Sequence, residues 1–418
     1  MTTKKIAIAC QGGGTHAAFT WGVLAEILET KQRWDSGDGV KFDIVTLSGT
    51  SAGALCALAT WYGLVPNITD PECGSLDKAV ERLNFLWTTF AATTPAEKTL
   101  NAAVTMALGL KERGVPLPDG NPYGAATNMA MACLPIMGVR DAYLGFPALL
   151  DKLCPDFASI DWAEVAKTNT RMIAGAIEIK SGNFEAFDSH KTLEEMALRA
   201  PRRDNVQYRV TRWRMRRALT LEGVAASGTL PEVLPAQKIP DMQFPTCTPG
   251  KTIRRDAYYW DGLYSQNPPV RLVLDAETRD EKPDEIWIVR INPQELYREL
   301  SGTADIHDRI NDLAGNLSLN AELDHIMILN KWLKEHGTVH PLFAKYKPVE
   351  VRTIKMRPES AWGLHSSTKL DRDRKHMEHL HDEGRAVTKE WLAGWRMNGN
   401  NFAAYPDDAR YPECPEGC

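Results

Sequence analysis

The N-terminal part of the chain alternates between short apolar runs and longer segments with helical periodicity. Residues 6–10 are apolar at every position, as in a central parallel strand that is buried on both faces. In the segment that follows, Phe19, Val23 and Ile27 lie on one stripe of a helix. A second apolar run, at 42–47, is again followed by strong helix formers. This β-α-β-α order predicts a parallel sheet covered by helices.

Similar patterns continue along the chain without a repeat, a low-complexity tract or a clear linker. Strands are predicted at 171–179, 184–187, 257–260, 285–290 and 349–355, and helices at 77–90, 221–228, 303–335 and 369–396, with one more starting at the capping box Thr192–Glu195. We therefore predict an α/β protein with a three-layer α/β/α fold and a mostly parallel central sheet over residues 1–355. A helical C-terminal extension over 356–418 is expected to pack on it.

The turn between the strand at 42–47 and the next helix carries a serine in a Gly-x-Ser-x-Gly pattern, with Ser51 between Gly49 and Gly53. A serine on a sharp strand-to-helix turn is the nucleophile elbow of serine acyl hydrolases. The two glycines allow the strand and the helix to approach closely, and the turn presents the hydroxyl at the edge of the sheet. The sequence therefore makes Ser51 a candidate nucleophile.

Ester hydrolysis also needs donors for the developing oxyanion and a base for the serine proton. The glycine loop Gly12, Gly13 and Gly14 offers bare amides at the start of a helix, and the amide of Ala52 follows the candidate nucleophile. For the base, Asp261 lies directly after an aromatic strand and before a glycine. Histidines without such a strand-end position remain as alternatives, at 190, 307, 325, 336, 340 and 365.

Taken in order, these motifs resemble the patatin-like phospholipase family. The resemblance covers residues 5–290 and includes the segments Phe19–Leu24, Ala225–Pro231 and Tyr259–Gly262 with Asn267-Pro268. It implies a patatin-like acyl hydrolase domain in which Ser51 is the nucleophile and Asp261 its dyad partner. It further implies an oxyanion hole of Gly12, Gly13 and Gly14, an acyl-enzyme intermediate, lipid acyl esters as substrates, and no cofactor or metal.

Some positions depart from the family pattern. His16 stands where Arg or Lys is common, Ala17 replaces a glycine, and Leu263 replaces the usual second glycine after the aspartate. His16 either assists the oxyanion or packs at the helix start, and we favour packing. A catalytically silent scaffold or lipid-binding protein with this fold is the alternative function. The glycine loop also fits a dinucleotide fingerprint, but the second strand ends in Leu47-Ser48 without the acidic residue that binds ribose.

Residues 100–150 are rich in Ala, Leu, Met, Pro and Gly, with four prolines that break apolar stretches. They fit either a mobile apolar cap over an acyl-chain pocket or short buried helices joined by loops. Eight arginines lie between Arg199 and Arg217. A solvated face is the favoured interpretation of these, with contact to anionic lipid head groups as the other. The cluster His376, His379 and His381 is interpreted as part of a solvated charged helix rather than a metal site.

Composition and charge limit the possible partners and the location of the protein. The chain has 418 residues and a net charge of −5, which argues against nucleic acid as a partner. The eight cysteines lack disulfide-like spacing, and neither a signal-peptide pattern nor an apolar run of membrane-spanning length is present. We therefore expect a cytoplasmic protein, with transient contact to a membrane surface left open. The sequence does not determine the ester, its chain length, an activator or the oligomeric state.

Overall fold

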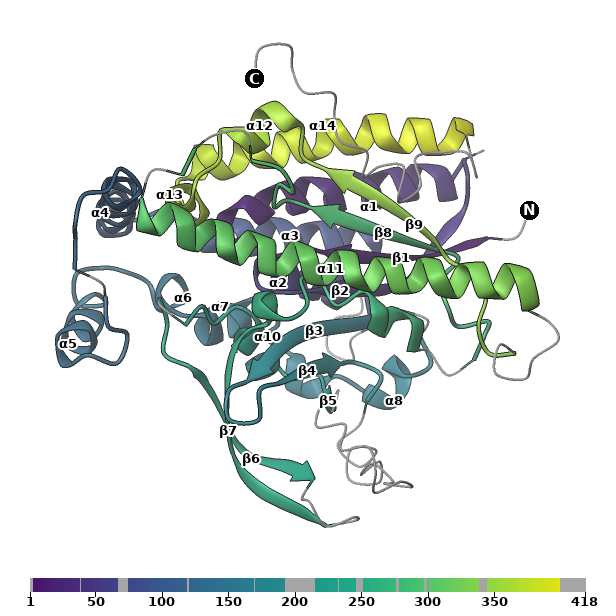
Figure 1. The fold of residues 1–418 in the computed structure, drawn as a ribbon, viewed down its shortest axis with the longest axis horizontal. Helices are drawn as coiled ribbons and strands as arrows, with labels where there is room; N and C mark the ends of the chain where they lie inside the picture. The colour runs from purple at the N-terminus through teal and green to yellow at the C-terminus, as the bar shows by residue number, and fades with distance from the viewer. Residues whose placement is uncertain are drawn as a thin grey trace.

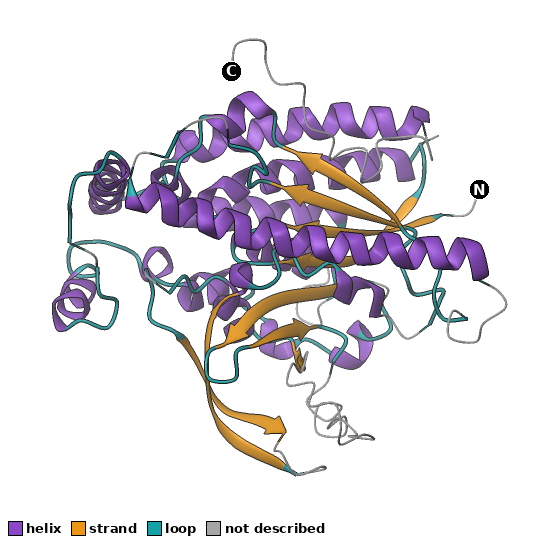
Figure 2. Ribbon diagram, viewed as in Figure 1, coloured by secondary structure: helices purple, strands orange, loops and turns teal. Residues whose placement is uncertain are grey.

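The computed structural model describes residues 3–398, apart from 38, 67–73, 119, 169, 192–214, 232, 246–250, 276–277, 297–298, 301 and 338–343. Figures 1 and 2 show a central sheet with helices on both faces. The helix predicted to start at Thr192 lies outside the described residues.

The main path of the sheet runs in the order β5-β4-β3-β2-β1-β8-β9. Its strands are β1 (Lys4–Cys10), β2 (Phe42–Gly49), β3 (Arg171–Glu178), β4 (Asn183–Asp188), β5 (Met215–Ala218), β8 (Glu285–Arg290) and β9 (Glu350–Lys355). Every pair from β3 through β2, β1 and β8 to β9 is parallel, as is β4 with β5, whereas β3 and β4 are antiparallel. The predicted mostly parallel sheet is confirmed.

Two further strands, β6 (Gln237–Pro245) and β7 (Thr252–Asp261), form an antiparallel ribbon that extends from the sheet (Figure 1). The end of β7 pairs with the same edge of β3 that β2 occupies further back. Gly49 of β2 faces Ala174, and Asp261 of β7 faces Ala176. The ends of β2 and β7 therefore meet beside one strand, although more than 200 residues separate them in the chain.

Side chains that alternate along the strands build two cores. On one face, Ile6 and Ile8 pack beneath α1 (Ala18–Asp35), α2 (Ala52–Leu64), α3 (Leu76–Phe90) and α14 (Arg374–Asn398). On the other face, Ala7 and Ala9 pack with Leu319 of α11 (Thr303–His336), the long helix in front of the sheet in Figure 1. The predicted three-layer fold is confirmed.

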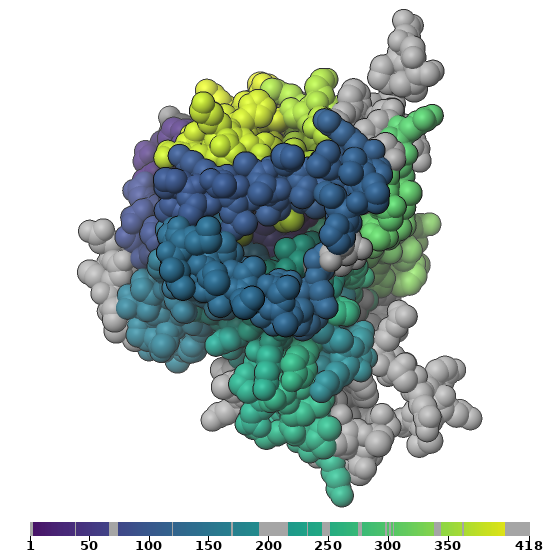
Figure 3. Space-filling model, turned by 90° about the vertical axis from the view of Figure 1, so that its left-hand side faces the viewer, coloured from purple at the N-terminus to yellow at the C-terminus, as the bar shows by residue number. Residues whose placement is uncertain are grey.

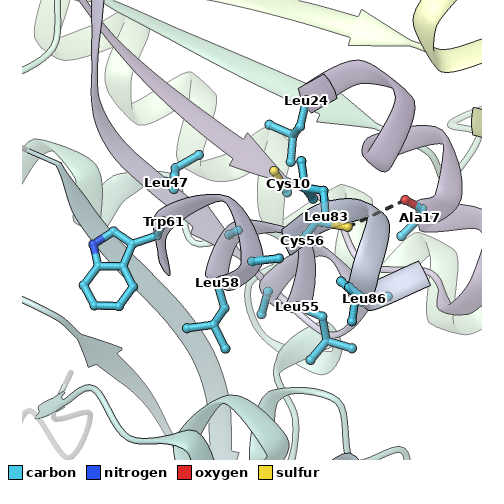
Figure 4. Close-up of a cluster of buried hydrophobic side chains, with 14 of the residues drawn as sticks. Cys10, Ala17, Leu24, Leu47, Leu55, Cys56, Leu58, Trp61, Leu83 and Leu86 are labelled. Atoms are coloured by element: carbon cyan, nitrogen blue, oxygen red, sulfur yellow. Dashed lines mark hydrogen bonds between the residues drawn. The ribbon is translucent and has the colours of Figure 1, made fainter. Parts of the chain in front are cut away.

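The helix that follows Ser51 is buried on all sides. Figure 4 shows Leu55, Cys56 and Leu58 of α2 among Leu83 and Leu86 of α3 and neighbouring apolar side chains. An all-apolar helix of this kind is held by tertiary packing rather than by its own propensity. The start of α2, where Ser51 lies, is therefore held by a well-buried apolar core.

The other helices are short or lie at the periphery. They are α4 (Pro95–Glu112), α5 (Ala125–Cys133), α6 (Asp141–Leu144), α7 (Phe146–Leu153), α8 (Trp162–Val165), α10 (Leu221–Ser227), α12 (Pro358–Trp362) and α13 (Ser366–Lys369), with 3-10 turns η1 (Gly14–Ala17), η2 (Phe157–Ser159), η3 (Gly262–Tyr264) and η4 (Arg271–Asp275). No helix in the described part of the chain has both the length and the apolar character that crossing a membrane requires.

Three interpretations of polar or irregular segments need correction. The interpretation of residues 100–150 as short buried helices is wrong for α4 and α5. Only Glu97 and Asn101 of α4 are buried, and no residue of α5 is. Of the segment Arg199–Arg217, residues up to 214 lie outside the described part. Arg217 is buried and pairs with Glu185 at 2.8 Å, so it is neither solvated nor available to lipid.

The predicted C-terminal helix is divided into α13 and α14, and it is not simply solvated. The ring of His381 lies 4.0 Å from that of Trp21, and His376 lies 6.3 Å from His16, while His379 is exposed. The face of α14 toward α1 is thus packed rather than open to water. Within the described ranges, no three His, Cys, Asp or Glu side chains are grouped so that they could hold a metal ion.

Candidate active site

Ser51 occupies a strained turn between β2 and α2. Its backbone angles are φ 56° and ψ −134°, a conformation that costs free energy for any residue with a side chain and is typical of functional turns. The flanking glycines make the turn possible. A Cβ atom on Gly49 would lie 2.4 Å from the carbonyl oxygen of Gly53, and one on Gly53 would lie 2.3 Å from that of Cys10. The strand and the helix are therefore packed backbone to backbone.

Asp261 is the last residue of β7 and is completely buried. Its backbone amide donates to the carbonyl of Thr229 at 2.9 Å, and its Oδ1 accepts the amide of Leu263 at 2.9 Å. Burial raises the pKa of this carboxyl from 3.8 to about 7, against the opposing effects of the Ser51 hydroxyl and the Leu263 amide. With a pKa of about 7, this buried carboxylate is a stronger base than a free aspartate.

Ser51 and Asp261 are brought together. The Ser51 hydroxyl acts on the Asp261 carboxyl as a hydrogen-bond donor that lowers its pKa. The contact falls short of ordinary hydrogen-bond geometry, because the buried Oδ2 has no partner that meets both distance and angle among the described residues. Catalytic hydrogen bonds are often long or poorly aligned until substrate binds. No histidine contributes to the pKa shift of Asp261.

The end of α10 holds both members of this pair. The Ser51 amide donates to the carbonyl of Ser227 at 3.1 Å and to its Oγ at 3.0 Å, while that Oγ donates to the carbonyl of Gly175 at 2.6 Å. Two residues on, Thr229 accepts the Asp261 amide. In the sequence, this segment stands out only as part of the family resemblance. Nothing in its small residues alone reveals that Ser227 anchors Ser51.

The glycine loop lies against the serine turn. A Cβ atom on Gly12 would be 2.6 Å from that of Ser51. The Gly12 amide donates to Oδ1 of Asn267 at 2.6 Å, so this predicted oxyanion donor already has an acceptor. The amides of Gly13, Gly14 and Ala52 donate no hydrogen bond to any other residue in the described part of the chain.

Buried amide side chains hold the glycine loop in place by hydrogen bonds to its backbone. Asn267 donates back to the Gly12 carbonyl at 3.2 Å, and Asn292 donates to the same oxygen at 3.0 Å. Gln11 accepts the amides of Ile291 and Asn292 at 2.9 Å and donates to Asn316 at 2.8 Å. The sequence does not reveal the roles of Gln11, Asn292 and Asn316, because Gln11 lies 280 residues from Ile291 and 305 residues from Asn316 and no local pattern connects them.

The C-terminal helix α13 forms a wall behind the loop. A Cβ atom on Gly14, whose φ is +61°, would lie 2.1 Å from the carbonyl oxygen of Lys369. Nε2 of His16 lies 2.8 Å from Oγ1 of Thr368, and burial lowers the pKa of this histidine. The packing interpretation of His16 therefore fits its surroundings. Lys369 is itself held by Asp308 at 2.6 Å and Asp312.

In the ester hydrolysis that the sequence predicts, Asn267→Ala is expected to lower kcat by about ten- to a hundredfold, because the Gly12 amide loses its acceptor and the loop shifts. A stability loss of about 1–3 kcal/mol should accompany it. Asn330 is a matched control, since it donates to and accepts from the backbone of Val349 at 2.7 and 2.9 Å, far from the loop. Asn330→Ala should lose similar stability and keep kcat; equal kcat in both variants would contradict a positioning role for Asn267.

A serine on a strained strand-to-helix turn of a three-layer α/β/α fold, beside an amide-rich loop, is the arrangement of α/β acyl hydrolases. A family model for patatin-like phospholipases matches residues 8–274, and the chain belongs to that family. No curated protein matches the chain significantly. The match supports a lipid acyl hydrolase. It ends before β8, so Asn292, Asn316 and the α13 wall lie outside it.

Proposed function

We propose that this protein hydrolyses lipid acyl esters with a Ser51–Asp261 dyad through an acyl-enzyme. The observation that carries the proposal is the burial of Asp261 next to Ser51, which raises the pKa of the carboxyl to about 7. A carboxylate of that basicity accepts the serine proton near neutral pH, whereas a solvated one is too weak a base. The alternative, a silent scaffold, gives no reason for an uncompensated carboxyl in the core.

In the acylation step, the Ser51 hydroxyl attacks the ester carbonyl carbon and its proton passes to Oδ2 of Asp261. The tetrahedral intermediate then expels the alcohol, which takes up that proton. In deacylation, Asp261 accepts a proton from water as the water attacks the acyl carbon. The bond from that carbon to the Ser51 oxygen then breaks, Asp261 returns the proton to this oxygen, and the carboxylic acid leaves. The dyad is regenerated, and the balance needs neither metal nor cofactor.

The oxyanion is assigned to the amides of Gly13, Gly14 and Ala52, which have no other acceptor in the described part of the chain. Gly12 takes a structural role through Asn267. Donors at the start of α2 also benefit from the helix dipole, which favours negative charge there. Each such donor typically contributes on the order of a hundred- to a thousandfold to the rate.

A fluorophosphonate ester tests the proposal directly, because it phosphonylates activated serines. We expect one adduct per chain, mapped by mass spectrometry to the peptide that contains Ser51. Its rate of formation should rise as the pH passes through about 7, since Asp261 must be deprotonated to act as base. Heat-denatured protein serves as the control. In parallel, the protein is incubated with a mixed lipid extract and released fatty acids are measured. If no adduct forms and no fatty acid is released, the protein is a silent scaffold.

A further inference from the structure

The segment between α4 and α6 is an exposed apolar arm. We call residues 114–138 the α5 arm; it contains α5 and stands away from the sheet in Figure 1. None of the nine residues of α5 is buried. Met129 is 71% exposed and Ile136 86% exposed. Between Arg113 and Arg140 the sequence holds one charged residue, Asp119. A helix this apolar and this exposed is typical of a surface that binds another protein or a membrane.

The base of the arm is fixed, and the arm touches the body of the protein through Leu134, which packs against a small buried cluster, and through the Tyr123 hydroxyl, which accepts the Ala236 amide at 2.9 Å. The buried carboxylate of Glu97 accepts from Arg140 at 2.6 Å and closes a capping box with Thr94. Glycines with positive φ, Gly114 (81°) and Gly138 (90°), begin and end the arm. A Cβ atom on Gly138 would meet nothing within 4 Å. The arm is thus a projecting element on an ordered foot.

Exposed cations lie near the foot of the arm, and the exposed Asp141 follows directly after Arg140. Lys98 and Arg113 are exposed near its foot, and none of the exposed residues that the structure describes from 98 to 140 is an Asp or a Glu. The carboxylate of Glu112 is taken up by Ser366 and Ser367. The apolar, methionine-rich tip is complementary to the acyl region of an anionic bilayer, and the two cations at the foot are complementary to its head groups.

The arm also lies at the entrance to the interior. Figure 3 looks onto this side and shows a hollow bordered by the blue residues of α4 and the arm. Atoms coloured purple and yellow, from the two ends of the chain, are visible within it. The glycine loop and α13 belong to these two ends. A surface that covers the arm would therefore cover the opening as well.

We propose that the α5 arm is a lipid-binding surface that seats this opening on an anionic bilayer. The inference deepens the proposed function, on which it rests, by naming aggregated lipid as the form in which the ester is reached. Inserting the apolar tip removes its side chains from water, and the cations at the foot then face the head groups.

The test compares two double variants in a Ser51→Ala background, so that the vesicles are not consumed. The arm variant is Met129→Glu with Ile136→Glu. The control is Leu317→Glu with Ile328→Glu, two side chains of α11 that are 59% and 47% exposed on another element. Binding is measured by flotation with phosphatidylcholine vesicles that contain none or about a third phosphatidylglycerol. We expect the arm variant to bind the anionic vesicles at least about tenfold more weakly, and the control to bind like its parent.

With Ser51 intact, the arm variant should keep its kcat/KM for a short water-soluble ester and lose activity on vesicles. Unchanged vesicle binding by the arm variant would overturn the proposal. So would an equal loss on the soluble ester, which would make the arm a cap for single substrate molecules. A light-scattering change from dimer to monomer with unchanged vesicle binding would assign the arm to a second copy of the chain. If the wild type binds vesicles but releases no fatty acid, the proposed function is rejected, whereas lipid binding by the α5 arm is still supported.

Discussion

Ser51→Ala is expected to reduce turnover of a soluble ester such as p-nitrophenyl butyrate by at least about 10³-fold. Alanine removes the attacking oxygen, and no other hydroxyl is anchored on a strained turn beside a buried carboxyl in the described part of the chain. The fold should persist, because the Ser51 amide keeps both of its acceptors on Ser227. The measurement is steady-state hydrolysis, with circular dichroism as the check on folding.

Ser48 provides the matched control. It lies in β2, three residues before Ser51, and its buried Oγ has no hydrogen-bond partner among the described residues. Ser48→Ala should therefore leave kcat unchanged, because it removes a hydroxyl that takes no part in the proposed chemistry. Normal hydrolysis by Ser51→Ala, with the fold intact, would exclude Ser51 as the nucleophile.

Asp261→Asn should abolish hydrolysis and also stabilise the protein at alkaline pH. The amide cannot accept the serine proton, and removing a general base of this kind costs about 10²- to 10⁴-fold in kcat. The stability effect follows from the raised pKa. In the folded state the carboxyl titrates near pH 7, whereas in the unfolded chain it titrates near 3.8.

The folded protein therefore holds this proton more tightly than the unfolded chain does. Its free energy of unfolding falls as the pH rises from about 4 to about 7, and the full cost remains above that range. A shift of about three pKa units corresponds to roughly 4 kcal/mol. Asp261→Asn lacks this cost, so its stability gain should be about 2–4 kcal/mol at pH 8 and close to zero at pH 4. Urea unfolding at the two pH values measures the difference.

Asp188→Asn should change stability in the opposite direction. Asp188 is also fully buried, but it pairs with Arg171, and its pKa is lowered despite burial by the charge and hydrogen bonds of that guanidinium. Its charged form stabilises the fold, so the asparagine variant should lose stability at pH 8. If Asp261→Asn also loses stability at pH 8, the raised pKa of Asp261 is wrong.

Local signals were sufficient for the elements that carry the site. The apolar run at 42–47, the glycines around Ser51 and the aromatic strand before Asp261 each act over a few residues, so the sequence predicts them. The mostly parallel sheet follows from such runs. The division into a domain over 1–355 and an extension over 356–418 stays a prediction, as do the roles assigned to the site residues.

The remaining parts depend on contacts that no local pattern encodes. Gln11 meets Asn316, and Thr15 donates to the carbonyl of Thr368 at 2.6 Å, through the folding of distant segments. The run of arginines predicted a solvated face, because arginines usually face water. Arg217 is instead buried, where it pairs with Glu185. The burial that changes the pKa of Asp261 is likewise a property of the assembled fold.

The contact between Gly14 and Lys369 bears on when the protein becomes competent during its synthesis. Ser51 and the glycine loop are synthesised early, but Ser227, which anchors the Ser51 amide, and Lys369, which lies against Gly14, follow more than 170 residues later. A nascent chain thus carries Ser51 long before the turn is anchored and the glycine loop is backed. The proposed dyad and its oxyanion loop can therefore assemble only after Lys369 has been synthesised.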